Sequence, residues 1–289
     1  MATLSTPQTP AHPQLEAPAP LRLWHLTSLD APTVALIWTL SFAWSVRVQL
    51  PLWLPAVIGL SAWSFYIADR LLDARAARSP LRPRHHFHWR HRRVFLPLAV
   101  LAGAAALALV LRYMPLAART RNTAIAAAAM LYFTSVHVPQ RIWQPIRRIP
   151  HPPKELIVGL LFTVVCVLPT WVRISAHPLP LLAPVLSFIA LAWLNCHAIE
   201  VWESVPPLRS ASITGQAALL AAAALVSAAV AAPHWPRIAA LLGTAALSAV
   251  FLLVLDRQRD RQRHRLAPTT LRAAADLVLL APALLLFVR

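Results

Sequence analysis

The chain has 289 residues, of which 58% are hydrophobic and 13% are charged, and its mean hydropathy is +0.59. Soluble domains carry about a quarter charged residues and disordered chains have low hydrophobicity, so an ordinary soluble enzyme and a disordered protein are both excluded. The net charge is +17, which fits nucleic acid or a membrane surface as a partner. The long apolar runs decide for a membrane.

Residues 1–21 are rich in proline, alanine and threonine and lack the layout of a signal peptide. We expect a disordered tail there, followed by one transmembrane domain over 22–289. A spanning helix needs about 20 mainly apolar residues. Nine segments meet this requirement, and they predict an all-α polytopic bundle: 31–50, 52–69, 94–112, 122–138, 155–172, 181–199, 212–231, 238–255 and 272–288.

The basic residues are divided unequally between the two sides that nine spans create. Most of the 27 fall in the tail and in the connections 70–93, 139–154, 200–211 and 256–271, or at the helix ends beside them. The excess of arginine and lysine in cytoplasmic loops predicts a cytoplasmic N-terminus and an external C-terminus in an inner membrane. All ten acidic residues also fall on the predicted cytoplasmic side, so we expect any cation chemistry there.

Two aspartates, Asp69 and Asp73, close the second segment one helical turn apart and share a helix face. Two carboxylates on one face repel each other unless a cation lies between them, and Mg²⁺ binds one or two carboxylates together with substrate phosphates. The alternative is that both pair with nearby arginines at the membrane interface. Tyr66, three residues before Asp69, is a candidate substrate contact.

A second polar group closes the sixth segment. Asn195, His197, Glu200 and Glu203 are spaced so that they could share one side of a helix. The alternative is an ordinary interfacial helix end with Trp202 as a membrane anchor.

The only lysine, Lys154, opens the fifth segment after several arginines that include Arg141 and Arg148. A helix N-terminus with basic side chains favours anions, so these three residues are candidates for binding a diphosphate. The alternative is that Lys154 is an interfacial cation whose stem lies along apolar surface.

Histidines and arginines crowd the stretch 82–93, with His85, His86, His88 and His91 among them. Such a tract can bind metal or single-stranded nucleic acid. The favoured interpretation is a loop that fixes topology and attracts anionic lipid headgroups, as for the similar run 256–265, and we expect no nucleic acid partner. Asp276 could point into the bundle, with no role assigned.

The nine spans and the two acidic helix ends together resemble the UbiA superfamily of intramembrane prenyltransferases. Asp69 and Asp73 match the last two aspartates of its first motif, N-D-x-x-D-x-x-x-D. Asn195 and Ile199 stand at the spacing of its second motif, D-x-x-x-D, where the acids are instead Glu200 and Glu203. Lys154 matches the basic residue that opens helix five in that family.

The resemblance implies Mg²⁺-dependent transfer of a prenyl group from an isoprenyl diphosphate to a lipophilic acceptor within the membrane. Asp69, Asp73, Glu200 and Glu203 would be the catalytic metal ligands, with Lys154, Arg141, Arg148, Asn195 and Tyr66 binding substrate. The second hypothesis is a non-catalytic UbiA-like membrane protein that binds or transports a lipid or an ion. The two differ in whether Glu200 and Glu203 face the two aspartates across a cavity.

Overall fold

A computed structural model describes residues 17–76, 82–137, 154–174, 178–203, 213–261 and 266–287. Within these ranges the protein is all-helical, as the sequence predicts. Its helices are α1 (Ala19–Leu26), α2 (Asp30–Ser45), α3 (Trp53–Ala76), α4 (Pro83–Arg90), α5 (Arg92–Tyr113), α6 (Leu116–His137), α7 (Lys154–Trp171), η3 (Leu179–Leu181), α8 (Leu182–Glu203), α9 (Ile213–Ala231), α10 (Pro236–Arg261), α11 (Pro268–Val278) and η4 (Ala281–Phe287).

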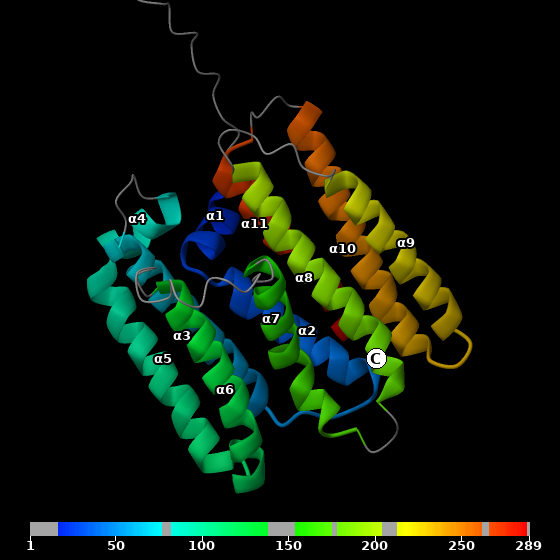
Figure 1. The fold of residues 1–289 in the computed structure, drawn as a ribbon, viewed down its shortest axis with the longest axis horizontal. Helices are drawn as coiled ribbons and strands as arrows, with labels where there is room; N and C mark the ends of the chain where they lie inside the picture. The colour runs from blue at the N-terminus through cyan, green and yellow to red at the C-terminus, as the bar shows by residue number, and fades with distance from the viewer. Residues whose placement is uncertain are drawn as a thin grey trace, which may run out of the picture.

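The helices form one bundle with α2 and α7 in its middle (Figure 1). α3 and α5 pack together on one flank, where α6 also lies, and α8, α9 and α10 make up the other flank. α2 contacts α3, α7, α10 and η4, so it joins the two flanks. The short helices α1, α4 and α11 lie at the same end of the bundle, where α1 contacts both of the others.

The core is built around aromatic side chains of α2 and α8. Trp38 and Phe188 are fully buried and stack with their ring centroids 3.8 Å apart, and Phe42 meets Phe188 edge-on at 6.0 Å. Because lipid is as apolar as these rings, the contribution comes from close van der Waals packing rather than from removal from water. This packing fixes α2 against α8 and so determines where the residues at either end of α2 lie along the bundle axis.

Each of the nine expected spans coincides with helical structure, but nine spans are not confirmed. Five helices are long and apolar enough to cross a membrane: α5, η3 with α8, α9, α10, and α11 with η4. The bent pair α1 and α2 would make six. α7 is slightly short, since its apolar stretch Glu155–Trp171 has 17 residues in all, and Asp69 and Asp73 shorten the apolar part of α3.

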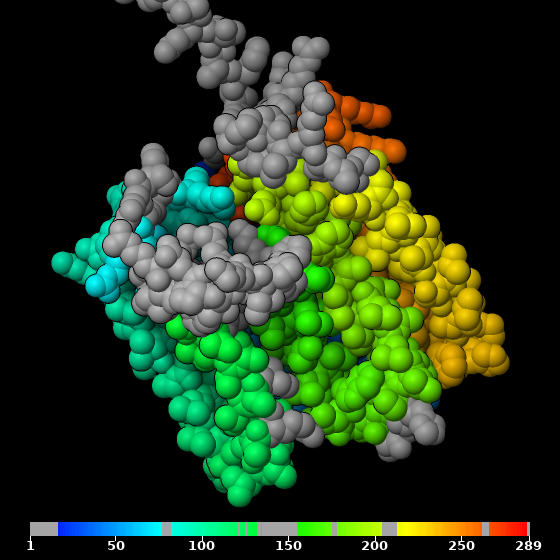
Figure 2. Space-filling model, in the orientation of Figure 1, coloured from blue at the N-terminus to red at the C-terminus, as the bar shows by residue number. Residues whose placement is uncertain are grey.

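Large apolar side chains cover the sides of the bundle. Val100 and Leu101 of α5 are each 63% exposed, and Leu219 and Val230 of α9 are more than 70% exposed. Monomeric soluble proteins rarely expose apolar patches of this extent, so the bundle surface fits a lipid environment. The face in Figure 2 includes α6 through α9, which lie side by side there.

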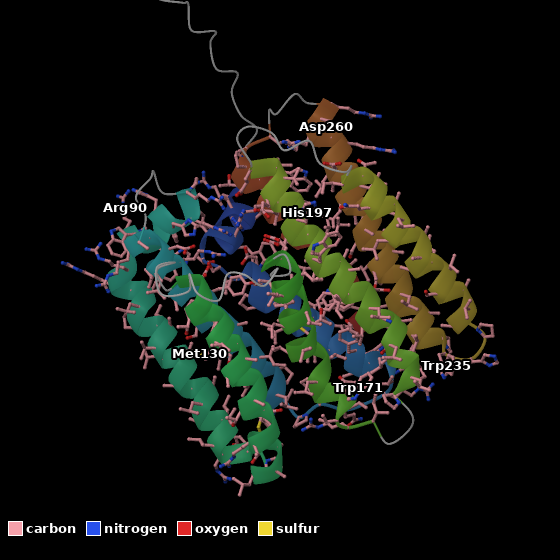
Figure 3. The ribbon with its side chains drawn as sticks, viewed as in Figure 1. Arg90, Met130, Trp171, His197, Trp235 and Asp260 are labelled. Carbon is pink, nitrogen blue, oxygen red and sulfur yellow. The ribbon has the colours of Figure 1, made fainter. Side chains whose placement is uncertain are left out.

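Side chains at the two ends of the bundle differ in character. Arg90 and Asp260 mark one end, while Trp171 and Trp235 mark the opposite end (Figure 3). Tryptophan is enriched at membrane–water interfaces. The polar end is the one that holds α1, α4 and α11.

The last helical segment is broken just before Pro282. Pro282 has no N–H for the carbonyl of Val278, and α11 ends at Val278 before the 3₁₀ turn η4 begins. Ser248 Oγ donates to that carbonyl at 2.7 Å, and Trp38 Nε1 donates to the carbonyl of Leu279 at 2.9 Å. Because lipid offers no hydrogen bonds, these two side chains stabilise the break.

Candidate functional site

A sharp corner between α1 and α2 brings His25 against Asp30. The axes of the two helices differ by 89°, and Ser28 in the corner has a φ of 55°. Asp30 opens α2, where its Oδ1 accepts the N–H of Ala31 at 2.9 Å. Its Oδ2 lies 2.7 Å from His25 Nδ1. The His25 side chain is 2% exposed and that of Asp30 is 8% exposed.

Two further side chains complete this cluster from helices distant in sequence. Asp276 of α11 places its Oδ2 3.8 Å from His25 Nδ1. Asn195 of α8 donates from Nδ2 to Asp276 Oδ1 at 3.0 Å, and the labelled His197 lies near it on the same helix (Figure 3). We call His25, Asp30, Asn195 and Asp276 the acid–histidine cluster.

The cluster has the geometry of a cation site. One ligand atom from each of His25, Asp30 and Asp276 lies within 4.8 Å of the other two, and within the described ranges this is the only such group of three metal-binding side chains. Two carboxylates this close in an apolar bundle cannot both stay charged without a cation or a shared proton. His25 Nε2 and Asn195 Oδ1 are buried with no hydrogen-bond partner, so two polar atoms at the site can still bind a ligand.

The carboxylates expected to hold Mg²⁺ are arranged differently. Asp69 is ion-paired with Arg70, and Asp73 Oδ2 lies 3.4 Å from His85 Nε2. Glu200 is exposed. These three contribute to no group of three close ligand atoms in the described part of the chain.

The fourth expected ligand, Glu203, is bound by two arginines. Arg272 donates to it from Nε at 2.5 Å and from a terminal nitrogen at 2.9 Å, and Arg82 lies 2.9 Å from its Oε2. A bidentate arginine occupies both carboxylate oxygens. Among the described residues the four carboxylates form no shared group of ligand atoms. Asp69 instead shows the alternative pairing with a nearby arginine, and Glu203 is ion-paired with Arg82 and Arg272.

The expected substrate-binding residues are only partly assembled. Asn195 joins the acid–histidine cluster, and the Tyr66 ring lies 5.5 Å from the guanidinium carbon of Arg70. Lys154 begins α7, as its position predicts, but its side chain is outside the described part of the chain, and so are Arg141 and Arg148.

The histidine-rich stretch is helical and packs against its neighbours. Phe87 meets Phe95 of α5 edge-on at 5.8 Å, and His88 is fully buried, with Nδ1 2.9 Å from the carbonyl of Arg84. Burial lowers the pKa of His88 to about 4, and it lowers the pKa of His85 although Asp73 opposes that change. Both side chains are therefore neutral near pH 7, which favours a packing role for α4.

Sequence reasoning named Asn195 but gave no site role to the other three members of the cluster. His25 lies in a short helix between the expected tail and the first expected span, and Asp30 immediately precedes that span. Asp276 carried the clearest signal, because an acidic residue inside an apolar helix is a functional candidate by default. The 81 positions that separate Asn195 from Asp276 hide their proximity.

No family model, curated protein or solved structure matches this chain. The geometry of its own side chains therefore carries the functional argument.

Proposed function

We propose that this chain is a membrane protein that binds a divalent transition-metal ion within its helical bundle, at the acid–histidine cluster. This is the ion-binding alternative of the sequence analysis. The observation that carries it is the convergence of His25, Asp30 and Asp276 within 4.8 Å from three different helices. Ionisable side chains buried between helices of a membrane bundle mark ion sites and ion pathways.

The donor set selects the class of metal. One imidazole nitrogen and two carboxylate oxygens suit Zn²⁺ or Mn²⁺, whereas Mg²⁺ favours an all-oxygen shell. Asn195 donates from Nδ2 to Oδ1 of Asp276, and hydrogen bonds of this kind orient a ligating carboxylate. Two charges on the aspartates would balance a divalent ion.

The test is metal binding to the purified full-length protein in detergent, measured by calorimetry with Zn²⁺ and with Mn²⁺. We expect one saturable site, and we expect Asp276→Asn and His25→Gln each to weaken binding at least about tenfold. Asp260→Asn is the matched control, because Asp260 is exposed on α10. Binding that is absent, or that is equal in all variants, would overturn the proposal.

A second candidate is the prenyl transfer that the sequence suggests. The observation in its favour is that α4 and the residue before it contact both expected motifs: His85 lies 3.4 Å from Asp73, and Arg82, which precedes α4, lies 2.9 Å from Glu203. A diphosphate would have to compete with Glu203 for Arg82 and Arg272. Mg²⁺-dependent binding of prenyl diphosphates that is lost in Asp69→Asn and Asp73→Asn would support this candidate, and binding that ignores both changes would exclude it.

A further inference from the structure

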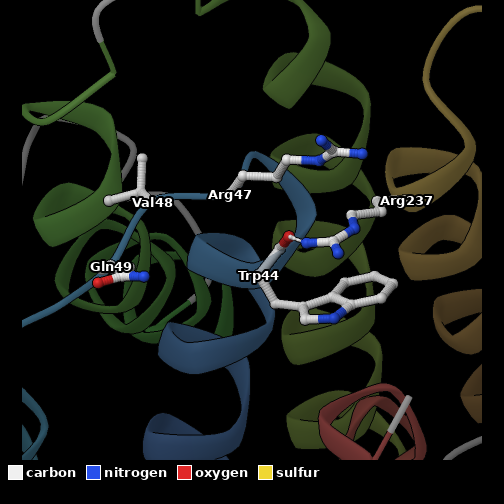
Figure 4. Close-up of a pocket in the computed structure, with 5 residues that line it drawn as sticks. All are labelled: Trp44, Arg47, Val48, Gln49 and Arg237. Carbon is white, nitrogen blue, oxygen red and sulfur yellow. Dashed lines mark hydrogen bonds between the residues drawn. The ribbon is translucent and has the colours of Figure 1, made fainter. Parts of the chain in front are cut away.

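A pocket with two arginines lies at the opposite end of α2 from the acid–histidine cluster. α2 has 16 residues, so the two sites are about 23 Å apart along its axis. The pocket has a volume of about 400 Å³ and is lined by Trp44, Arg47, Val48, Gln49 and Arg237. Figure 4 shows both arginine side chains reaching over the end of α2. The volume falls in the range of small-ligand sites.

Arg237 is held in place by Trp44. Its guanidinium carbon lies 5.0 Å from the centre of the indole ring, and one terminal nitrogen donates to the Trp44 carbonyl at 3.2 Å. One hydrogen bond leaves most of the five guanidinium donors available. The side chain is thereby ordered before any ligand arrives, which lowers the entropy cost of binding.

Arg47 stands where a glycine is usual. The N–H of Val48 bonds to the Ala43 carbonyl at 2.9 Å and the N–H of Arg47 to the Trp44 carbonyl at 3.2 Å. This pair of bonds defines a Schellman helix end, whose left-handed position is normally glycine. Arg47 has a φ of 57° there, which costs a residue with a Cβ about 1–2 kcal/mol. Backbone strain of this kind is found at ligand-binding positions, and here it places the Arg47 side chain beside the pocket.

The charge at this end of the bundle is unbalanced. In the part of the chain that the structure describes, neither Arg47 nor Arg237 has an ion pair with an acidic side chain. Arg47 is exposed and Arg237 is half-buried. Two guanidinium groups over one pocket suit a phosphate group, which arginines bind through paired hydrogen bonds.

We propose that Arg47 and Arg237 bind the phosphate of an anionic ligand, of which an anionic phospholipid headgroup and free phosphate are the two sources. This site is independent of the metal site in the acid–histidine cluster. The indole of Trp44 orders Arg237, and Arg47 supplies the second guanidinium across the pocket.

The test is binding of three probes to the purified full-length protein: short-chain phosphatidylglycerol, short-chain phosphatidylcholine and inorganic phosphate. We expect Arg47→Gln and Arg237→Gln each to weaken phosphatidylglycerol binding about tenfold or more. If inorganic phosphate binds as tightly as phosphatidylglycerol, free phosphate is the ligand. If phosphatidylglycerol binds more tightly than both other probes, the ligand is the anionic lipid. Arg112→Gln is the matched control, because Arg112 is an exposed arginine at the end of α5.

Arg47→Gly separates binding from folding. Glycine adopts the left-handed conformation without the Cβ penalty, so we expect a thermal midpoint at least equal to that of the parent together with the same loss of binding as Arg47→Gln. Unchanged binding in Arg47→Gly and Arg237→Gln would overturn the proposal. An equal loss in Arg112→Gln would also overturn it, because it would show a general effect of interfacial charge.

Discussion

Two buried aspartates of this protein have opposite surroundings. Asp256 accepts three hydrogen bonds, from Trp202 Nε1 at 2.9 Å, from the N–H of Thr214 at 3.0 Å and from its hydroxyl at 2.8 Å. Asp276 accepts one from Asn195 and otherwise faces His25 and a second acid, Asp30. A charged carboxylate is stabilised by donors and destabilised by a like charge, so Asp256 is structural and Asp276 is held at the expense of stability.

This contrast predicts opposite effects of substitution on stability in metal-free detergent solution. Asp256→Ala leaves the indole and hydroxyl donors without a partner, and we expect a loss of about 1–3 kcal/mol. Without a metal ion the carboxyl groups of Asp276 and Asp30 must share a proton. Asp276→Asn removes that constraint and keeps the shape of the side chain, so we expect the thermal midpoint to rise or to stay equal. A fall in the midpoint of Asp276→Asn comparable to that of Asp256→Ala would contradict a functional role for the cluster. Asp260→Ala, on the exposed face of α10, is the reference substitution.

His88 predicts a pH dependence of stability. Its pKa is lowered from 6.5 to about 4 by burial, with the positive charges of Arg70 and Arg84 acting in the same direction. The unfolded chain therefore binds more protons than the folded one between about pH 4 and 6.5, and stability is lost as pH falls through that window. Each unit of pKa difference corresponds to about 1.4 kcal/mol.

We expect the thermal midpoint of His88→Gln to fall less between pH 6.5 and pH 4 than the thermal midpoint of the parent protein does. His86→Gln, on the exposed side of the same helix, is the control and should leave the slope unchanged. Equal slopes in the parent and in His88→Gln would show that other groups govern the acid response.

The residues that pair across the bundle could not be found from the sequence. The spacing of Asp69 and Asp73 gives their shared helix face, and the adjacent Arg70 was an expected partner, but the spacing does not reveal that His85 of α4 contacts Asp73. The spacing of Glu200 and Glu203 likewise gives no sign that Arg272 binds one of them from 69 positions away. Local periodicity fixes which side chains share a helix face, whereas ion pairs between helices depend on rotation and level, which only packing sets.

Long apolar helices could be located from the sequence, whereas short polar helices could not. α5 and α10 match their expected segments because each presents a continuous apolar stretch of membrane length. α1 and α4 have eight residues each, which is too short for periodicity to be detected. Proline stands at the second position of α1 and at the first position of α4. Proline in the first turn is only a weak signal for the start of a helix. α1 is the helix that supplies His25.

The break between α11 and η4 depends on donors from other helices. We expect Ser248→Ala to lower the free energy of unfolding by about 1–3 kcal/mol, because it leaves the carbonyl of Val278 unpaired in an apolar interior. Ser227→Ala is the matched control, since Ser227 donates within α9 to the carbonyl of Ala223 on the exposed side. A detergent unfolding titration measures both, and equal stabilities would show that the break needs no outside donor.

At the scale of the whole molecule, acidic side chains distinguish the polar end of the bundle from the opposite end, where Arg47 and Arg237 have no acidic partner among the described residues. The acid–histidine cluster and the arginines around Glu203 lie at the polar end, and the pocket of Arg47 and Arg237 lies at the other. The sequence expectation places the polar end in the cytoplasm. That expectation makes α3 a spanning helix even though its last turns are charged.

The side on which each turn lies tests this topology directly. α3 has 24 residues, so it is about 36 Å long and can cross a hydrocarbon core of about 30 Å. We expect Gln49→Cys, before α3, to react with a membrane-impermeant thiol reagent from outside intact cells. His86→Cys, after α3, should react only when the membrane is opened, and Leu116→Cys, after α5, should again react from outside. All three positions are exposed.

The parent chain sets the background for this experiment, because Cys166 is buried and Cys196 is half-buried. Since α5 qualifies as a span by length and composition, His86→Cys and Leu116→Cys should react from opposite sides under any topology that keeps it. The comparison of Gln49→Cys with His86→Cys then shows whether α3 crosses the membrane. Reaction of both from the same side would remove α3 from the spans, and with it the nine-span topology and the placement of Asp69 and Asp73 at a membrane interface.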